Sequence, residues 1–475
     1  AEAQKAHLSG QAGRHSRRGR SEKAGAPRAR RHGKGHRGRV TGRSAEGAAR
    51  SRGAGGIRAS ASGDGEKRGL LISATGTGKT YASAFAMREL GFKSVLFLVH
   101  RNQIATQAER SYKNVFGSSV TTGVVGGGSY GFDADLVFAT MQTMCKDENL
   151  SRYAPDHFDC IVYDEAHHTA AGSYKKIMDY FDPKFSLGMT ATPDRRDSDM
   201  DGRNIYELCD YNVPYEISLK DAINKGMLVP FHYYGIYDDT DYSALHIVRG
   251  KYDEKELNET YIGNVHRHDL IYRYYCKYGS SQALGFCCSK AHAEEMAEEF
   301  SKRGIPSVAV YSNANGTYSE DRGKALEKLK NGEIKVIFSV DMFNEGVDIT
   351  SVDMVMFLRP TESPTVFLQQ LGRGLRKSKG KEYLNVLDFI GNYEKAGRVR
   401  FLLAGANETG EKNYRGADRI QVPDDCLIDF DMKLIDLFSE MDKKNLRIRE
   451  QIQKEYFRIR DLLQRRPTRM DLITY

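Results

Sequence analysis

The chain has 475 residues and a formal net charge of +8, a length that suits about three domains. Residues 1–70 hold 18 Lys or Arg against 5 Asp or Glu, so this segment carries +13 and the remainder carries −5. No secretory signal is visible, no apolar run approaches the ~18 residues of a membrane span, and the seven cysteines form no Cys-x-x-Cys pair. We therefore expect a cytoplasmic protein and not a membrane protein, a zinc protein or a disulfide scaffold.

Residues 1–65 form a basic leader that contains no Phe, Tyr or Trp and very few aliphatic side chains. Such a segment buries too little apolar surface to offset its ordering entropy, so we expect it to be disordered. It could be an arm that binds nucleic acid, a transit peptide or a misjoined upstream reading frame. We favour the last interpretation, because the chain begins with Ala and its composition changes abruptly near residues 63–66.

A phosphate-binding loop follows at residues 73–80, Ser-Ala-Thr-Gly-Thr-Gly-Lys-Thr. It lies between the apolar run 69–72 and a helix-compatible segment at 81–90, and this strand, loop and helix context argues against a plain Gly/Thr turn. Glycines allow backbone N–H groups to close around phosphate oxygens. Ser73 stands where the general pattern has its first glycine. The residues expected to bind ATP are Thr75, Gly76, Thr77, Gly78, Lys79 and Thr80, of which Lys79 neutralises the β- and γ-phosphates and Thr80 holds Mg²⁺.

Beyond this loop, short apolar runs alternate with segments of helical period, which predicts parallel strands with helices between them. The runs form one set from 69 to 163 and a second set from 282 to 388. We therefore predict two tandem α/β domains, at 66–220 and 221–405. A helical extension is predicted at 406–475, whose apolar residues recur at helical spacing and are expected to pack against the second domain.

A second chemical motif, Asp164-Glu165-Ala166-His167, follows the apolar run 158–163. A carboxylate at the carboxyl end of a parallel strand can lie beside the phosphate loop and hold Mg²⁺. We therefore assign Asp164 to the metal and Glu165 to polarising the attacking water. An acidic pair after a strand is often only a helix cap, but its position behind a phosphate loop favours a catalytic role.

Further motifs accompany these two. They are His100-Arg101-Asn102, Thr140-Met-Gln142, Thr190-Ala-Thr192, Asn344-Glu-Gly346-Val-Asp348 and Gln369-x-x-Gly372-Arg373-x-x-Arg376. In this order they resemble the motifs of superfamily 2 DEAD/DEAH-box helicases, over about residues 69–405. Among these helicases, the chain resembles bacterial proteins related to type III restriction enzyme motor subunits and excision-repair helicases.

The resemblance implies two RecA-like domains that hydrolyse ATP with Mg²⁺ and move along nucleic acid. It places Gly346 and Asp348 at the ATP cleft and makes Arg373 and Arg376 the candidate arginine fingers, which would stabilise charge on the γ-phosphoryl group when the domains close. The residues expected to couple hydrolysis to movement are His167, Thr190, Thr192 and Gln369. The residues expected to contact the strand are Arg101, Asn102, Thr140 and Gln142.

The predicted function is therefore that of an ATP-dependent helicase or translocase, with DNA as the expected strand. Two alternatives stay open, a nucleotide-switched clamp and a defective fragment of a larger restriction or repair motor, because the leader contains no segment like the adenine-reading glutamine motif of the family. The chain ends at Tyr475 in mid-pattern. We therefore expect a nuclease or specificity module that is absent from this chain.

Overall fold

The computed structural model divides into two units, Ala1–Val40 and Thr41–Tyr475. The residues that it describes are 42–62, 66–166, 172–191, 205–242, 245–248, 251–343, 349–360, 364–393, 396–403, 423, 425–463 and 465–468. Within these ranges, no helix combines the length and the hydropathy needed to cross a bilayer.

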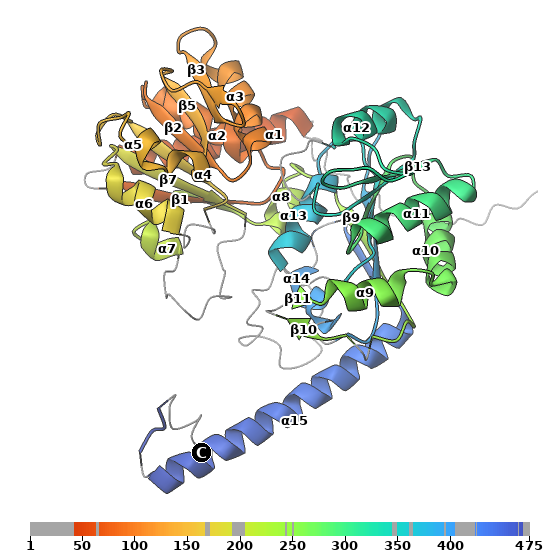
Figure 1. Cartoon of the computed structure of the whole chain (residues 1–475). Helices are drawn as coiled ribbons and strands as arrows, with labels where there is room; N and C mark the ends of the chain where they lie inside the picture. Colours follow the sequence, from red (N-terminus) through yellow and green to blue (C-terminus); the bar gives the residue numbers. More distant parts are fainter. Residues whose placement is uncertain are drawn as a thin grey trace, which may run out of the picture. The chain divides into compact units, whose positions relative to one another are not determined.

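The first domain is built on one eight-stranded sheet. Its strands are β1 (Arg68–Ser73), β2 (Val95–Val99), β3 (Thr122–Gly126), β4 (Ser129–Tyr130), β5 (Leu136–Thr140), β6 (Cys160–Asp164), β7 (Phe185–Thr190) and β8 (Tyr215–Ile217). Their order is β4-β3-β5-β2-β6-β7-β1-β8, and every neighbouring pair is parallel except β3 with β4. Figure 1 labels β1, β2, β3, β5 and β7 of this sheet. The predicted parallel sheet is confirmed.

Side chains on β2 alternate between the two faces of this sheet, as the pleat requires. Phe97 belongs to a cluster with residues of three helices, α1 (Gly42–Ala61), α2 (Lys79–Glu89) and α3 (Asn102–Phe116). Leu96 and Leu98 belong to the opposite cluster. The helices whose residues join that cluster are α4 (Met141–Met144), α5 (Asp147–Leu150), α6 (Gly172–Tyr180) and α7 (Ile205–Leu208).

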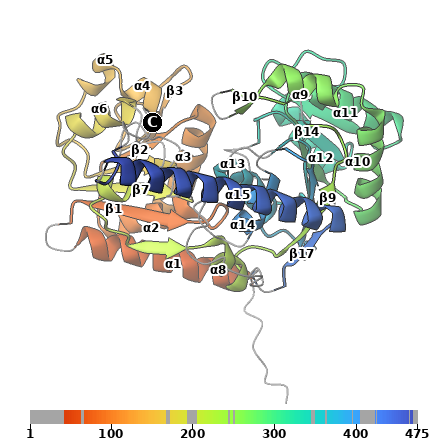
Figure 2. The ribbon, with the colours of Figure 1, turned by 90° about the horizontal axis from the view of Figure 1, so that it is seen from below.

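Helix α1 corrects our expectation of a disordered leader. Residues 42–61 are helical, and α1 lies alongside α2 in the first domain (Figure 2). The expectation of disorder therefore does not hold for this part of the segment 1–65. Residues 1–41 and 63–65 lie outside the described residues.

Close packing of small residues explains why α1 can dock with so few aliphatic side chains. Ile57 is fully buried. A Cβ added to Gly53 would lie 3.3 Å from the Cβ of Ala82, and one added to Gly56 would lie 2.3 Å from the carbonyl oxygen of Pro214. Glycine at these positions lets the helix backbone approach its neighbours closely. The number of aliphatic side chains, on which we based the expectation of disorder, does not include such contacts.

The second domain is built on a sheet of seven strands, all paired in parallel. They are β9 (Phe231–Tyr237), β12 (Ala283–Phe286), β13 (Ser307–Val310), β14 (Val336–Ser339), β15 (Met354–Phe357), β16 (Leu384–Ile390) and β17 (Leu427–Phe430), in the order β13-β14-β12-β15-β16-β9-β17. A separate two-stranded antiparallel pair joins β10 (Ile247–Val248) to β11 (Lys251–Tyr252).

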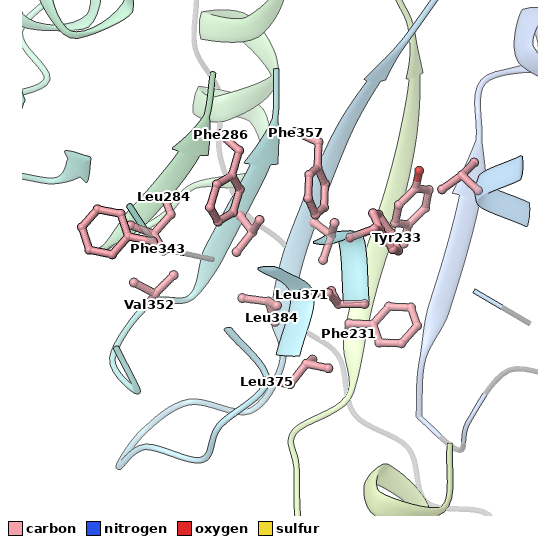
Figure 3. Close-up of a cluster of buried hydrophobic side chains, with 14 of the residues drawn as sticks. Phe231, Tyr233, Leu284, Phe286, Phe343, Val352, Phe357, Leu371, Leu375 and Leu384 are labelled. Carbon is pink, nitrogen blue, oxygen red and sulfur yellow. The ribbon is translucent and has the colours of Figure 1, made fainter. Parts of the chain in front are cut away.

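One face of this second sheet carries a large apolar cluster, whose labelled members include Phe286, Phe357 and Leu384 (Figure 3). Helix α13 (Pro364–Gly374) contributes Leu371 to the same cluster. The other helices of this part of the chain are α8 (Leu219–Asn224), α9 (Glu254–Tyr261), α10 (Val265–Tyr278), α11 (Lys290–Lys302), α12 (Arg322–Asn331), α14 (Val399–Leu403) and α15 (Met432–Leu463).

The segment after residue 405 is not purely helical, contrary to our prediction. Strand β17 pairs with β9 at the edge of the second sheet. Helix α15 follows, and Leu434 and Phe438 on its first turns join the apolar cluster of this domain. The short strand escaped prediction because only two of its residues, Ile428 and Phe430, are partly buried, as is usual for an edge strand. Packing of these first turns against the second domain agrees with our expectation, whereas Ile452 farther along the helix is exposed.

Candidate nucleotide and nucleic-acid site

The carboxyl ends of three strands gather the nucleotide-site residues of the first domain. Strand β7 lies between β1 and β6. In its register Thr190 pairs with Ile72 of β1, and Met189 pairs with Asp164 of β6. The phosphate loop leaves the sheet at the end of β1, so parallel pairing brings this loop, Thr190 and the acidic motif to one edge.

The phosphate loop is closed by its own side chains. Gly76 and Gly78 have φ values of 91° and 90°, in the left-handed region that glycine adopts without strain. The hydroxyl of Thr77 donates to the carbonyl of Ala74 at 2.7 Å, and the Ser73 hydroxyl lies 2.6 Å from the Thr77 hydroxyl. Because Thr77 has given its proton to Ala74, Ser73 is the donor in this second bond. Ser73 therefore supports the loop at the position where the general pattern has glycine.

Lys79 connects this loop to the acidic motif electrostatically. Its Nζ donates to the carbonyl of Ser73 at 2.9 Å. Burial lowers the pKa of Lys79, while the carboxylates of Glu165 and Asp164 act to raise it. The ammonium and both carboxylates thus interact within one site. Thr80 follows Lys79 in the first turn of α2. Its hydroxyl and the Asp164 carboxylate are hard oxygen donors of the kind that Mg²⁺ prefers.

Glu165 has an uncommon backbone conformation. Its φ is 49°, in the left-handed region that costs a non-glycine residue roughly 1–3 kcal/mol. It follows directly on Asp164, the last residue of β6. Among the charged groups near Lys79, its carboxylate has the largest effect on the lysine pKa. The turn after β6 therefore holds this carboxylate beside the phosphate loop.

The predicted strand contacts occupy the other half of the same edge. Arg101 is exposed and precedes α3, which begins at Asn102 directly beyond β2. Thr140 ends β5 and caps α4, accepting a bond from the backbone N–H of Thr143 at 3.3 Å, and Gln142 in this helix is exposed. Strands β5 and β2 are neighbours, so these four predicted residues gather at one place.

Asn102 lies against the turn that joins β3 to β4. A Cβ added to Gly127 in this turn would lie 2.3 Å from Nδ2 of Asn102, and Gly127 has a φ of 60°. Glycine suits this position because it has no Cβ to collide with Asn102 and because it adopts a positive φ without strain. The turn therefore borders the segment expected to contact the strand.

Helix α13 carries the predicted arginine motif. Gln369 and Arg373 are buried in it, and the half-buried Arg376 follows its end. A Cβ added to Gly76 would lie 3.2 Å from Cγ of Arg376, and the charges of both arginines act to lower the pKa of Lys79. The structure therefore brings both guanidinium groups into electrostatic range of the phosphate loop.

Some predicted site residues lie outside the described residues, and the structure gives no position for them. They are His167, Thr192, Gly346 and Asp348.

Arg50, which no sequence motif indicated, is brought to the phosphate loop by α1. Its guanidinium carbon lies 4.8 Å from the ring centroid of Tyr81, and a Cβ added to Gly78 would lie 3.0 Å from its Nε. Arg50 lines a small cavity together with Gly78 and Lys79. The signal was present in the spacing of Ala54 and Ile57, which marks one face of a helix, but the basic composition of the leader obscured it.

Comparison with known protein families agrees with this arrangement. Residues 43–195 match the family described as type III restriction enzyme, res subunit, and residues 266–378 match the helicase conserved C-terminal domain. These two matches confirm the resemblance to superfamily 2 helicases. The first match begins at residue 43, so it includes α1 and contradicts the interpretation of this part of the leader as a misjoined frame.

Individual relatives extend the comparison. The chain is 28% identical over 359 residues to IRC3 of Saccharomyces cerevisiae, which is named as a candidate ATP-dependent helicase. The aligned region covers 69% of this chain and 49% of IRC3. It is 27% identical over 367 residues to the EcoAI type I restriction endonuclease subunit of Escherichia coli, covering 69% of this chain and 44% of that subunit. The chain thus spans about half the length of these relatives.

A solved structure supports the fold. The ATP-dependent type ISP restriction-modification enzyme LlaBIII, bound to DNA, resembles this chain with a TM-score of 0.56 at 19% identity, over 83% of this chain and 32% of that enzyme. At this identity the likeness shows the fold alone. The prediction of two tandem RecA-like α/β domains is confirmed.

Proposed function

We propose that the chain is an ATP-driven motor that moves along nucleic acid, with DNA as its strand. The observation that carries this proposal is the arrangement of one sheet edge. Its β1, β7 and β6 half holds the closed phosphate loop with Lys79, Asp164 and Glu165. Its β2 and β5 half presents Arg101 and Gln142 to solvent. This arrangement supports a nucleotide site on the same sheet as a surface suited to a phosphate backbone.

Each group of the nucleotide site has a distinct role in this proposal. Backbone N–H groups of residues 75–79 and the ammonium of Lys79 bind the ATP phosphates. Thr80 and Asp164 would hold Mg²⁺, which would neutralise charge on the β- and γ-phosphates. Glu165 orients the attacking water and accepts its proton. Arg373 and Arg376 stabilise the charge that spreads over the transferred phosphoryl group.

The remaining predicted residues complete the cycle. Gly346 and Asp348 would border the nucleotide from the second domain. Opening and closing of the two domains would change the spacing of strand-contacting loops with the nucleotide state. Coupling of this motion to hydrolysis is assigned to His167, Thr190, Thr192 and Gln369, and strand contact to Arg101, Asn102, Thr140 and Gln142.

DNA is the preferred strand because restriction enzymes recur among the similar proteins, and one solved structure among them is bound to DNA. The kinship with an endonuclease subunit also supports a nuclease or specificity module as the partner of this chain. Because ATP and nucleic acid meet inside the cell, we place the protein in the cytoplasm. A clamp that binds strands according to its nucleotide, without moving, is the second candidate.

Hydrolysis of ATP by the purified chain, measured with single-stranded DNA, double-stranded DNA and RNA, tests the proposal. We expect DNA to raise kcat severalfold, and Lys79→Ala provides the background from contaminating ATPases. Tight ATP-dependent binding of DNA without any rise in hydrolysis would instead establish the clamp. Stimulation by RNA alone would contradict the choice of DNA.

A further inference from the structure

We propose that Tyr174 is a positioning residue that couples strand binding to ATP hydrolysis within the first domain. This inference rests on the proposed function, because it connects the candidate strand-contacting segment to the acidic motif. Its hydroxyl lies 2.9 Å from Nε2 of His100 and 3.4 Å from the carbonyl oxygen of Asp164, to which it donates. A hydroxyl carries one proton, so with this bond made it accepts the Nε2–H of His100.

The two partners of Tyr174 belong to the two halves of the sheet edge. His100 directly follows β2 and precedes Arg101, whereas Asp164 ends β6. Strands β2 and β6 are neighbours, with Leu98 paired to Tyr163. Tyr174 itself comes from α6, which covers the face of the sheet beneath this junction. One hydroxyl thus bridges the segment expected to contact nucleic acid and the strand expected to hold the metal.

The position of this hydroxyl is fixed by packing. Tyr174 is fully buried, and its ring centroid lies 5.5 Å from that of His100 and 6.0 Å from that of Tyr163. Close-packed side chains transmit displacement instead of absorbing it. A movement of His100 on strand binding would therefore move the Tyr174 hydroxyl.

The hydrogen bond from Tyr174 to the Asp164 carbonyl acts on the peptide plane that sets the backbone conformation of Glu165. The carbonyl oxygen of Asp164 lies in the peptide plane that joins Asp164 to Glu165, so a hydrogen bond to this oxygen helps to fix the orientation of that plane. Rotation of the plane changes φ of Glu165, which is held at 49°. Such a strained conformation persists only while its surroundings constrain it. Tyr174 is one of these constraints, and the carboxylate that it orients is the one assigned to the attacking water.

Tyr174→Phe tests the inference because it removes the hydroxyl and keeps the ring. The matched control is Tyr153→Phe. Tyr153 is buried in the same apolar cluster, and its hydroxyl donates to the carbonyl of Phe132 at 2.6 Å. Both variants lose one buried hydrogen bond of a tyrosine, so we expect similar, modest falls in melting temperature. The measured quantity is the ratio of DNA-stimulated to basal kcat.

We expect Tyr174→Phe to lower this ratio by about 2- to 30-fold, the range of coupling effects of residues between two sites, and Tyr153→Phe to leave it unchanged. In the background of His100→Ala, Tyr174→Phe should cause no further loss, because the bridge is already broken. If Tyr174→Phe is poorly stable, His100→Ala alone breaks the same bridge from its other end, and we expect it to lower the ratio as well.

Four results would contradict these expectations in different ways. An unchanged ratio in Tyr174→Phe, or an equal loss in Tyr153→Phe, overturns the coupling while leaving the motor intact. Additive losses in the His100 background show that the two side chains act independently. A wild-type chain that hydrolyses ATP without any stimulation by nucleic acid overturns the proposed function and the coupling with it.

Discussion

The hydroxyl of Ser73 donates to the hydroxyl of Thr77 at 2.6 Å and so closes the phosphate loop. Removing it in Ser73→Ala leaves the bond from Thr77 to Ala74 in place but loosens the loop. One neutral hydrogen bond contributes about 1 kcal/mol, so we expect KM for ATP to rise by roughly 5-fold with little change in kcat. Steady-state kinetics measures both. Ser111→Ala, on the outer helix α3, is the control, and a loss of kcat at constant KM would contradict a purely structural role.

Lys79 and Glu165 should separate binding from chemistry. Lys79→Ala is expected to abolish hydrolysis, because this ammonium is the loop cation assigned to the β- and γ-phosphates. Glu165→Gln should retain nucleotide affinity and stop turnover, because an amide cannot accept the proton of the attacking water. Binding of a fluorescent ATP analogue and phosphate release are measured on the same preparations. Lys113→Ala, which removes an exposed lysine paired with Glu109 at 2.8 Å, should behave as wild type, and normal turnover in either site variant would remove the proposed site.

Arg376→Ala should preserve ATP affinity and reduce hydrolysis by about 10³- to 10⁵-fold, the contribution of arginine fingers in related phosphoryl-transfer sites. Arg373→Ala is expected to be similar or milder in kcat, and it should also lower the melting temperature because Arg373 is buried in α13. Affinity and turnover are measured together. If Arg376→Ala loses affinity and thermal stability along with turnover, the residue is structural and the closing mechanism lacks its trigger.

Arg50 is expected to contribute to nucleotide binding through its position beside Gly78. We predict that Arg50→Ala raises KM for ATP by several-fold and that Arg50→Lys recovers part of the loss, since the positive charge returns without the planar guanidinium. The control is Arg58→Ala on the same helix, where the exposed guanidinium pairs with Glu89 at 3.2 Å. Equal effects of the two alanine variants would mean that α1 acts only through its stability.

Asp388 should make the second domain less stable as pH rises. Burial raises its pKa from the ordinary 3.8 to about 7, partly offset by the hydrogen bond from Tyr233 at 2.5 Å. Between these two values the folded carboxyl keeps a proton that the unfolded one has released, so the free energy of unfolding falls as pH rises through this window and is level above it.

Asp388→Asn removes this titration and keeps the shape of the side chain. Relative to wild type, the variant is expected to gain stability of up to a few kcal/mol near neutral pH and above, and less in acid. Melting temperatures of both proteins at about pH 5 and about pH 8 measure the effect. Parallel pH dependence in the two proteins would show that Asp388 does not titrate in this range.

Particular elements show what the sequence could predict. The apolar runs at 94–99 and 158–163 are the parallel strands β2 and β6, because fully buried strands carry uninterrupted apolar side chains. By contrast, β17 was not predicted. This edge strand is held by backbone pairing with β9, so its side chains show little of the apolar pattern from which a strand is predicted. Helix α1 was missed because glycine and alanine contribute through close approach, which composition does not record.

The sequence predicts the chemistry of the candidate nucleotide site, since the phosphate loop, the acidic motif and the arginine motif each need particular residue types at fixed local spacing. Which other residues lie beside these motifs depends on the tertiary structure. The register of β7 between β1 and β6, the approach of Arg50 to Gly78, and the bridge from Tyr174 to His100 connect residues far apart in the chain. Such contacts depend on strand order and helix packing, which are set by the burial of whole faces and not by any local pattern.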